Sequence, residues 1–384
     1  MKKFLALLLA LVMSLSLVAC GGGDDTAADG GADAEDGGNA ETAAYQVAMI
    51  TDYGDITDQS FNQTTYEACQ EFCDAEGLQF EYYKPAGDST AERVAMVDAA
   101  VADGYNVIVM PGYAFAETIK ETAELYPDVT FIALDVAQGD LEDYTVPSNV
   151  YCAVYQEELC GYMAGYAAVK LGYTHLGVLG GMAVPAVQRF GYGFVQGADA
   201  AAVEMGIADQ VVMEYVYGNQ FFGDSDITAY MDNWYQTLGV EVVFASGGGI
   251  YTSAAEAAAK VGGKLIGVDV DQSANIDTYG EGMCVTSAMK GLAETVKHML
   301  GEVVAGNFAN YGGQVETLGL VNGDDPTANY VQLPMETTQW GDGFTQDDYK
   351  ALVKAMYDGD VTVSNDISAM PATTITVNFA GNIK

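Results

Sequence analysis

Histidine and basic side chains are scarce in this chain of 384 residues. It has 2 His and 14 Lys plus Arg against 54 Asp plus Glu, which gives a net charge of −40. A surface this acidic repels nucleic acid and anionic lipid headgroups, so we expect no nucleic-acid partner. With so few His, a Ser-His-Asp or Cys-His catalytic arrangement is hard to build. The motifs His-Glu-x-x-His, Gly-x-Ser-x-Gly and Gly-Lys-Ser/Thr do not occur either, and we expect no catalytic residue and no cofactor.

The first apolar run is too short to span a bilayer, which takes roughly 20 residues. Residues 4–17 are apolar except for Ser14 and Ser16, follow two lysines, and lead to Leu-Val-Ala-Cys ending at Cys20. This pattern is typical of a signal peptide over residues 1–19, with cleavage before a lipid-modified Cys20. The alternative is an ordinary secretory cleavage site that happens to contain a cysteine.

Residues 20–44 continue with Gly, Asp, Ala and Glu. Positions 21–44 contain seven acidic residues and no basic one. Such a segment cannot bury enough apolar surface to fold, so we expect a disordered tether behind the lipidated cysteine. The rest of the chain is then expected at the extracytoplasmic face of the cell membrane, anchored through lipid.

The other five cysteines do not form the framework of a small disulfide-rich domain. Cys69 and Cys73 stand one helical turn apart but lack a nearby third ligand, so we expect no metal site. Most of the five are expected to be small core residues. A Cys152–Cys160 or Cys69–Cys73 bridge stays open at this point.

From residue 45 onward, apolar β-branched runs alternate with amphipathic stretches such as 60–77, 89–103 and 114–126. Continuous apolar strands between helices are typical of a parallel sheet that is covered on both faces. Ten strands are many for one sheet, so we predict an α/β protein with two doubly wound parallel-sheet lobes. The predicted strands are 45–51, 80–84, 106–111, 130–135, 149–155, 175–180, 210–217, 241–245, 264–269 and 283–289.

Polar or glycine residues stand where several predicted strands end. Asp52 follows the first strand, Asp135 ends the fourth, and Asp269 ends the ninth. The glycines 247–249 predict a tight turn, which either needs glycine for its backbone or lets a ligand approach. Ligands of open α/β sheets bind beyond the carboxyl ends of the strands. Two such sheets facing each other would place these residues in one cleft.

The polar segment 52–63 opens a predicted helix, for which Asp58 or Ser60 is a suitable cap. Phe61 can pack under this helix or face the cleft beside Asn62. In the cleft, the pair offers a planar heterocycle a ring face and an amide edge. Lys290 stands at the end of an apolar strand, and we expect it to point into the cleft.

The chain resembles the basic membrane protein family of ABC-transporter substrate-binding lipoproteins, among which are purine nucleoside receptors. Its segment 52–63, ending Asp-Gln-Ser-Phe-Asn-Gln, is similar to the first loop of that family. Further similar segments follow in order over about residues 45–310. These are 131–135, 156–158 with 161–166, 180–181 with Pro185, 190–194 with Gly197, 266–272 and 286–290.

The resemblance implies a type I periplasmic binding protein-like fold, in which a hinge joins the lobes and the ligand binds in the cleft between them. It also implies that an aromatic residue from each lobe sandwiches the base. Phe61 would be the residue of the first lobe. Phe222 fits best in the second lobe, with Phe221 as its rival, because segment 218–224 departs from the Gly-Ser-Phe-x-Asp-Pro usual in the family.

The same resemblance implies that Asp269 holds the ribose hydroxyls and that Lys290 reaches the sugar or Asp269. Further ligand-binding residues are expected along the cleft. They are Asp52, Asn62 and Asp135 at the base edge or ribose, Gly248 in the turn that lets backbone groups approach, and Asp58 in the first loop.

We expect lobe 1 to comprise 45–152 plus 284–320, and lobe 2 to comprise 153–283 plus 321–384. The expected partners are a small-molecule nucleoside and an ABC permease in the membrane, and the protein is expected to act as a monomer. Three alternatives remain: the same architecture with a sugar or autoinducer-like ligand, a lipid-anchored adhesin or sensor without a transport role, and a secreted hydrolase.

Overall fold

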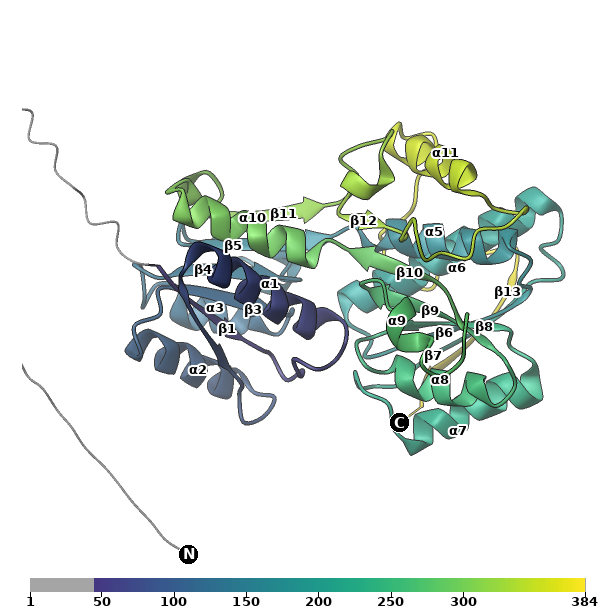
Figure 1. Ribbon diagram of the computed structural model, residues 1–384, viewed down its shortest axis with the longest axis horizontal. Coiled ribbons are helices and arrows are strands. Elements are labelled where there is room, and N and C mark those ends of the chain that lie inside the picture. Colours follow the sequence, from purple (N-terminus) through teal and green to yellow (C-terminus); the bar gives the residue numbers. More distant parts are fainter. Residues whose placement is uncertain (1–44, 384) are drawn as a thin grey trace, which may run out of the picture. The chain divides into compact units, whose positions relative to one another are not determined.

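Two mostly parallel β-sheets with helices packed on their faces make up residues 45–383, the part of the chain that the structure describes (Figure 1). This computed structural model confirms the predicted α/β class with two doubly wound lobes. All ten predicted strands are present, with ends shifted by at most two residues. The predicted signal peptide, Cys20 and the tether lie outside the described residues.

The first sheet has six parallel strands. In spatial order they are β11 (Gln314–Leu318), β5 (Val150–Tyr155), β4 (Thr130–Leu134), β3 (Val107–Pro111), β1 (Gln46–Ile50) and β2 (Gln79–Tyr83).

The second sheet has seven strands, all parallel except for the short antiparallel pair of β12 and β10. In spatial order they are β12 (Val331–Gln332), β10 (Cys284–Lys290), β9 (Lys264–Asp269), β8 (Val242–Ser246), β6 (His175–Gly180), β7 (Val212–Tyr217) and β13 (Thr376–Asn382).

Helices connect the strands of both lobes. They are α1 (Phe61–Glu76), α2 (Thr90–Ala102), α3 (Phe115–Thr122), α4 (Gln138–Leu141), α5 (Glu157–Lys170), α6 (Pro185–Met205), α7 (Ser225–Asn233), α8 (Tyr251–Ala259), α9 (Ser273–Ile276), α10 (Leu292–Val304) and α11 (Gln346–Tyr357). A π-helical turn, η1 (Trp234–Leu238), continues α7, and two 3₁₀ turns, η2 (Phe308–Asn310) and η3 (Pro326–Ala328), follow α10.

Five strands of each sheet follow the same spatial order. In the first sheet this order is β2–β1–β3–β4–β5, and in the second it is β7–β6–β8–β9–β10. In the first sheet, β2 is therefore added on one side of β1, and β3, β4 and β5 on the other, so the direction of winding switches between β1 and β3. In the second sheet it switches between β6 and β8. Doubly wound sheets bind ligands at this switch point. The topology thus predicts ligand contacts just after β1, β3, β6 and β8.

The chain passes between the two sheets three times in the described part. It crosses after β5, after β10 and after β11. The predicted return to lobe 1 at residue 284 is wrong by one strand, because β10 pairs with β9 in the second sheet and α10 then packs on α1. The predicted departure at residue 152 is early by three residues, since β5 stays in the first sheet to Tyr155.

Helices α5 and α6 approach each other closely through glycine faces. An added Cβ on Gly161 would lie 2.2 Å from the carbonyl oxygen of Phe190, and one on Gly193 would lie 2.2 Å from that of Glu158. No side chain fits there, so the spacing of the two helices is fixed by their backbones. This packing sets Arg189 of α6 beside the first turn of α5.

The five cysteines in the described range are buried and free. Four of them are fully buried: Cys69, Cys73, Cys152 and Cys160. The expectation that they are small core residues is confirmed. Neither of the two bridges left open by the sequence is formed.

Candidate ligand-binding site

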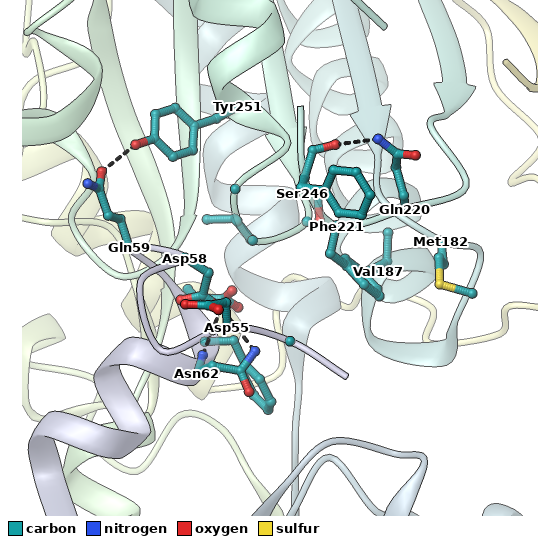
Figure 2. Close-up of a pocket in the computed structure, with 18 of the residues that line it drawn as sticks. Asp55, Asp58, Gln59, Asn62, Met182, Val187, Gln220, Phe221, Ser246 and Tyr251 are labelled. Atoms are coloured by element: carbon teal, nitrogen blue, oxygen red, sulfur yellow. Dashed lines mark hydrogen bonds between the residues drawn. The ribbon is translucent and has the colours of Figure 1, made fainter. Parts of the chain in front are cut away.

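A cavity of about 820 Å³ lies where the carboxyl ends of the two sheets face each other (Figure 2). Its lining comes from the segments after β1, β2, β3, β4, β6, β7, β8 and β9 and from the end of β10. All of the predicted ligand-binding residues line it: Asp52, Asp58, Phe61, Asn62, Asp135, Phe222, Gly248, Asp269 and Lys290. The structure therefore brings them together, while their roles toward a ligand stay predictions.

Asp58 is held by its own loop. Its carboxylate accepts backbone N–H bonds from Ser60, Asn62 and Gln63 at 2.9, 2.9 and 3.1 Å, which caps the start of α1. Its Oδ2 also accepts the Asn62 Nδ2 at 3.0 Å. The buried Asn62 Oδ1 has no hydrogen-bond partner within residues 45–383. Asp58 thus orients Asn62, whose free acceptor is available to a ligand donor.

Asp52 lies at the switch point of the first sheet. Its Oδ1 accepts the backbone N–H groups of Tyr53 and Gly54 at 2.6 and 2.8 Å. Burial nevertheless raises the pKa of Asp52 to about 6. Gly112, which follows β3, has a φ of 129°, and an added Cβ would lie 2.6 Å from the Asp52 Oδ2. Only glycine therefore leaves room for this carboxylate.

Lys290 is the centre of a buried charge cluster. Its Nζ lies 2.6 Å from the Asp135 Oδ2 and 3.7 Å from the Asp269 Oδ1, and the exposed fraction of its side chain is 2%. Asp135 follows β4 and Asp269 ends β9, so they occupy corresponding positions in the two sheets. Lys290 thus joins the two lobes through one carboxylate from each.

Both aspartates adopt the left-handed backbone conformation, with φ of 60° for Asp135 and 66° for Asp269. Such a conformation typically costs on the order of 1–3 kcal/mol outside glycine and recurs at functional sites. The same strain at matching strand ends of both lobes indicates that the position of each carboxylate matters more than local stability.

Burial raises the pKa of Asp135 and of Asp269, and the Lys290 ammonium offsets only part of this effect. For Lys290, burial by itself lowers the pKa, but the carboxylates of Asp135, Asp269 and Glu157 outweigh it, so the net shift is upward. The cluster therefore keeps its cation, and not all of its carboxylate oxygens are paired with a donor. The buried Asp135 Oδ1, which has no partner among the described residues, is a ready acceptor for a ligand hydroxyl.

The sequence analysis missed two members of this cluster. Glu157 is fully buried, and its Oε1 lies 3.5 Å from the Lys290 Nζ. Its Oε2 accepts the Arg189 Nε at 2.6 Å. Two weak signals were available: Glu157 lies in the family-like segment 156–158, and Arg189 is one of only two arginines in the chain.

The aromatic residues around the cavity come from both lobes. The Lys290 Nζ lies 4.6 Å from the ring centroid of Phe61, a cation–π distance. Phe221 faces Tyr53 of the other lobe, with ring centroids 6.0 Å apart and planes inclined by 25°. Phe222 is 63% exposed at the rim. Burial therefore favours Phe221, the rival, over Phe222 as the second-lobe aromatic residue.

The glycine turn after β8 fits against Phe221. An added Cβ on Gly247 would lie 3.2 Å from the Phe221 Cδ1, and one on Gly248 would lie 3.2 Å from its carbonyl oxygen. Gly248 also has a φ of 54°. The turn thus packs tightly against the aromatic residue, and it lines the cavity as predicted.

Direct hydrogen bonds join the lobes across the cavity. Ser60 donates its hydroxyl to the Asp269 Oδ2 at 2.6 Å. The carbonyl oxygen of Gln59 accepts the Gln272 Nε2 at 3.1 Å, and its side chain accepts the Tyr251 hydroxyl (Figure 2). The described conformation is therefore closed, with the loop after β1 touching the second lobe.

Within residues 45–383, no group of three or more His, Cys, Asp or Glu is placed to hold a metal ion. No helix in that range is both long and apolar enough to cross a membrane.

Two doubly wound lobes around one cavity are the architecture of the type I periplasmic binding protein fold. The solved structure of an ABC transporter solute-binding protein from Aeropyrum pernix K1 matches with a TM-score of 0.64 and 23% identity, over 84% of this chain and 88% of that chain. A second such protein, from Conexibacter woesei, also matches with a TM-score of 0.64 and 23% identity, over 84% of this chain and 99% of that chain. These neighbours confirm the expected fold.

The family model of PnrA-like ABC transporter substrate-binding proteins matches residues 45–324, and the chain belongs to this family. The resemblance found in the sequence is thereby confirmed, and the family is one of binding proteins rather than enzymes.

Curated relatives agree with this assignment. Basic membrane protein B of Borreliella burgdorferi is 26% identical, over 72% of this chain and 79% of that protein. The ABC transporter nucleoside-binding protein BmpA of Lactococcus lactis is 25% identical, over 72% and 80%. The CD4+ T-cell-stimulating antigen of Listeria innocua is 26% identical, over 87% and 95%.

Proposed function

We propose that this protein binds a purine nucleoside between its lobes and delivers it to an ABC permease. The observation that carries the proposal is the surplus of buried acceptors around Lys290, flanked by Phe61 and Phe221 from opposite lobes. A nucleoside presents a planar base for the rings and hydroxyl donors for the carboxylates. The nucleoside-binding relative from Lactococcus lactis supports this choice of ligand.

In this arrangement Asp135 and Asp269 accept the ribose hydroxyls, while Asn62 and Asp52 face the edge of the base. Each hydrogen bond to a charged group contributes about 1.5–3 kcal/mol, and each aromatic stack about 1–3 kcal/mol. Two of each offset the cost of ordering the ligand and closing the hinge, and leave roughly micromolar or tighter affinity. Since the contacts come from both lobes, binding favours the closed form.

Single truncations of three phenylalanines test which rings stack on the base. We expect Phe61→Ala and Phe221→Ala each to lower nucleoside affinity roughly ten- to hundredfold, because one stack is lost. Phe222→Ala is the matched control and should leave affinity nearly unchanged, since Phe222 is 63% exposed. Calorimetric titration of the three variants measures this. A loss confined to Phe222→Ala would return the stacking role to Phe222, and unchanged affinity in all three would remove the base sandwich.

We also propose that Cys20 carries the lipid that anchors the protein outside the cytoplasmic membrane. The signal pattern before Cys20 supports this, as does an archaeal relative from Pyrococcus abyssi that is named a lipoprotein and is 25% identical over 59% of this chain. In a bacterial host, Cys20→Ser should move the full chain from the membrane fraction to the soluble fraction. The control Cys69→Ser should stay with the membrane. A Cys20→Ser protein that still sediments with membranes would contradict the anchor.

A further inference from the structure

Glu157 stands behind the cavity, where two of the three crossings between the sheets come close together. It is the first residue of α5, just after the chain leaves β5, while Lys290 is the last residue of β10, just before the chain returns to the first lobe. Glu157 is fully buried and lies between two cations, with its Oε2 2.6 Å from the Arg189 Nε and its Oε1 3.5 Å from the Lys290 Nζ. That Oε1 has no hydrogen-bond partner in the described part of the chain.

We propose that Glu157 is a positioning residue, which leaves Lys290 paired with Asp135 but holds it 3.7 Å away from Asp269, so that the Asp269 carboxylate and the unpaired Asp135 Oδ1 keep acceptor capacity for the hydroxyls of a ligand sugar. Glu157 lies behind Lys290, outside the set of residues that line the cavity, and acts on the ligand only through Lys290. The inference rests on the proposed function, because it presupposes that the two aspartates accept hydrogen bonds from the hydroxyls of a sugar.

The charges of the cluster support this role. Three carboxylates (Asp135, Asp269 and Glu157) face two cations (Lys290 and Arg189), so the cluster has an excess of one negative charge. An ammonium group has three donors, and here it is shared among three carboxylates at 2.6, 3.5 and 3.7 Å. Without the charge of Glu157, Lys290 would be attracted only to the two aspartates. It would then move closer to Asp269, whose Oδ1 would be occupied by the protein instead of remaining open to a ligand.

Arg189 holds Glu157 from the side opposite Lys290. Its side chain reaches Glu157 from α6, and the glycine-packed contact of α5 with α6 fixes their relative position. Glu157 therefore cannot swing toward Lys290 to form a short ion pair. The 3.5 Å separation of Glu157 from Lys290 is a consequence of this anchoring, and it lets Glu157 attract Lys290 without displacing it from Asp135.

The test compares a nucleoside with its 2′,3′-dideoxy form, which lacks the 2′ and 3′ hydroxyls but keeps the 5′ hydroxyl. Wild-type protein should prefer the hydroxylated form, and Glu157→Gln should reduce that preference roughly tenfold, the equivalent of about one charge-assisted hydrogen bond. Glu158→Gln is the matched control. Its side chain is also buried in the first turn of α5, but no contact joins it to Lys290, so the preference should not change.

If Glu157 had a purely structural role, Glu157→Gln would weaken the binding of both ligands equally and leave the ratio of their affinities as it is in wild type. A wild-type ratio in Glu157→Gln would therefore overturn the inference. If Glu157→Gln fails to fold, Glu157→Asp replaces it: this variant keeps the charge but withdraws it by one methylene, so its preference for the hydroxylated form should be smaller than that of wild type, and an unchanged preference would overturn the inference. Wild-type protein that binds nucleosides without preferring the hydroxylated form also overturns the inference. Wild-type protein that binds no nucleoside overturns the proposed function itself.

Discussion

Replacing Lys290 with methionine is expected to destabilise the folded protein by about 3–5 kcal/mol, the usual result of breaking a buried ion pair from one side. The change removes the cation that lies within 4 Å of Asp135, Asp269 and Glu157, and leaves three buried carboxylates without it. The melting temperature should fall by roughly 10 °C at neutral pH. Lys297→Met is the matched control, because Lys297 forms an exposed pair with Glu71, and such pairs contribute little.

The loss in Lys290→Met should depend on pH in a defined direction. Burial already raises the pKa of Asp135 and Asp269 above that of an unfolded chain, and the loss of the cation raises it further. In the window between the unfolded and folded pKa values, the folded state binds more protons, so its stability falls as pH rises. The variant should therefore melt closest to wild type near pH 5 and furthest from it near pH 8. A melting curve like that of Lys297→Met at every pH would contradict this account of the cluster.

Replacing Asp269 with asparagine should lower nucleoside affinity by roughly a hundredfold or more, while the protein stays folded. The carboxylate is proposed to accept two ribose hydroxyls, and each such bond contributes about 1.5–3 kcal/mol when the acceptor is charged. Asparagine has the same shape as aspartate and is uncharged. Burial already disfavours the charged form of Asp269 and raises its pKa, so we expect the neutral side chain to be tolerated. It can still accept the Ser60 hydroxyl that joins the lobes.

The control for this variant is Asp271→Asn. Asp271 stands two residues further along, outside the cavity lining, where it accepts the Thr337 hydroxyl at 2.7 Å. Calorimetry should show unchanged nucleoside affinity for Asp271→Asn and a large loss for Asp269→Asn. Equal affinities in the two variants would remove Asp269 from the proposed binding site.

The sequence predicts the central strands well because burial on both faces of a sheet requires an apolar residue at nearly every position. Segments such as 107–111 and 242–246 are buried on both faces, so they read as continuous apolar runs between helices. The strands it missed, β11, β12 and β13, lie toward the sheet edges, are short or partly exposed, and carry no such run. The boundary error at residue 284 has a related cause, because a crossing depends on which strand pairs with which.

The candidate site could be predicted where function is tied to strand ends. Asp52, Asp135 and Asp269 all follow from the rule that ligands bind beyond the carboxyl ends of parallel strands. Glu157 could not be found in this way, since its place beside Lys290 depends on two crossings that meet only in three dimensions. The choice between Phe221 and Phe222 likewise depends on the packing of Phe221 against Gly181 and Gly247, which stand at the ends of other strands, so no local pattern reveals it.

The most direct test of the account is a calorimetric titration of the domain from residue 45 onward with a purine nucleoside, its free base and free ribose. A cavity that uses both ring stacking and buried carboxylates needs both halves of the ligand in one molecule. We predict micromolar or tighter affinity for the nucleoside and at least roughly hundredfold weaker binding of each half, which is the loss of about 3 kcal/mol of contacts. Tight binding of a free sugar, with no heat from any nucleoside, would contradict the central claim.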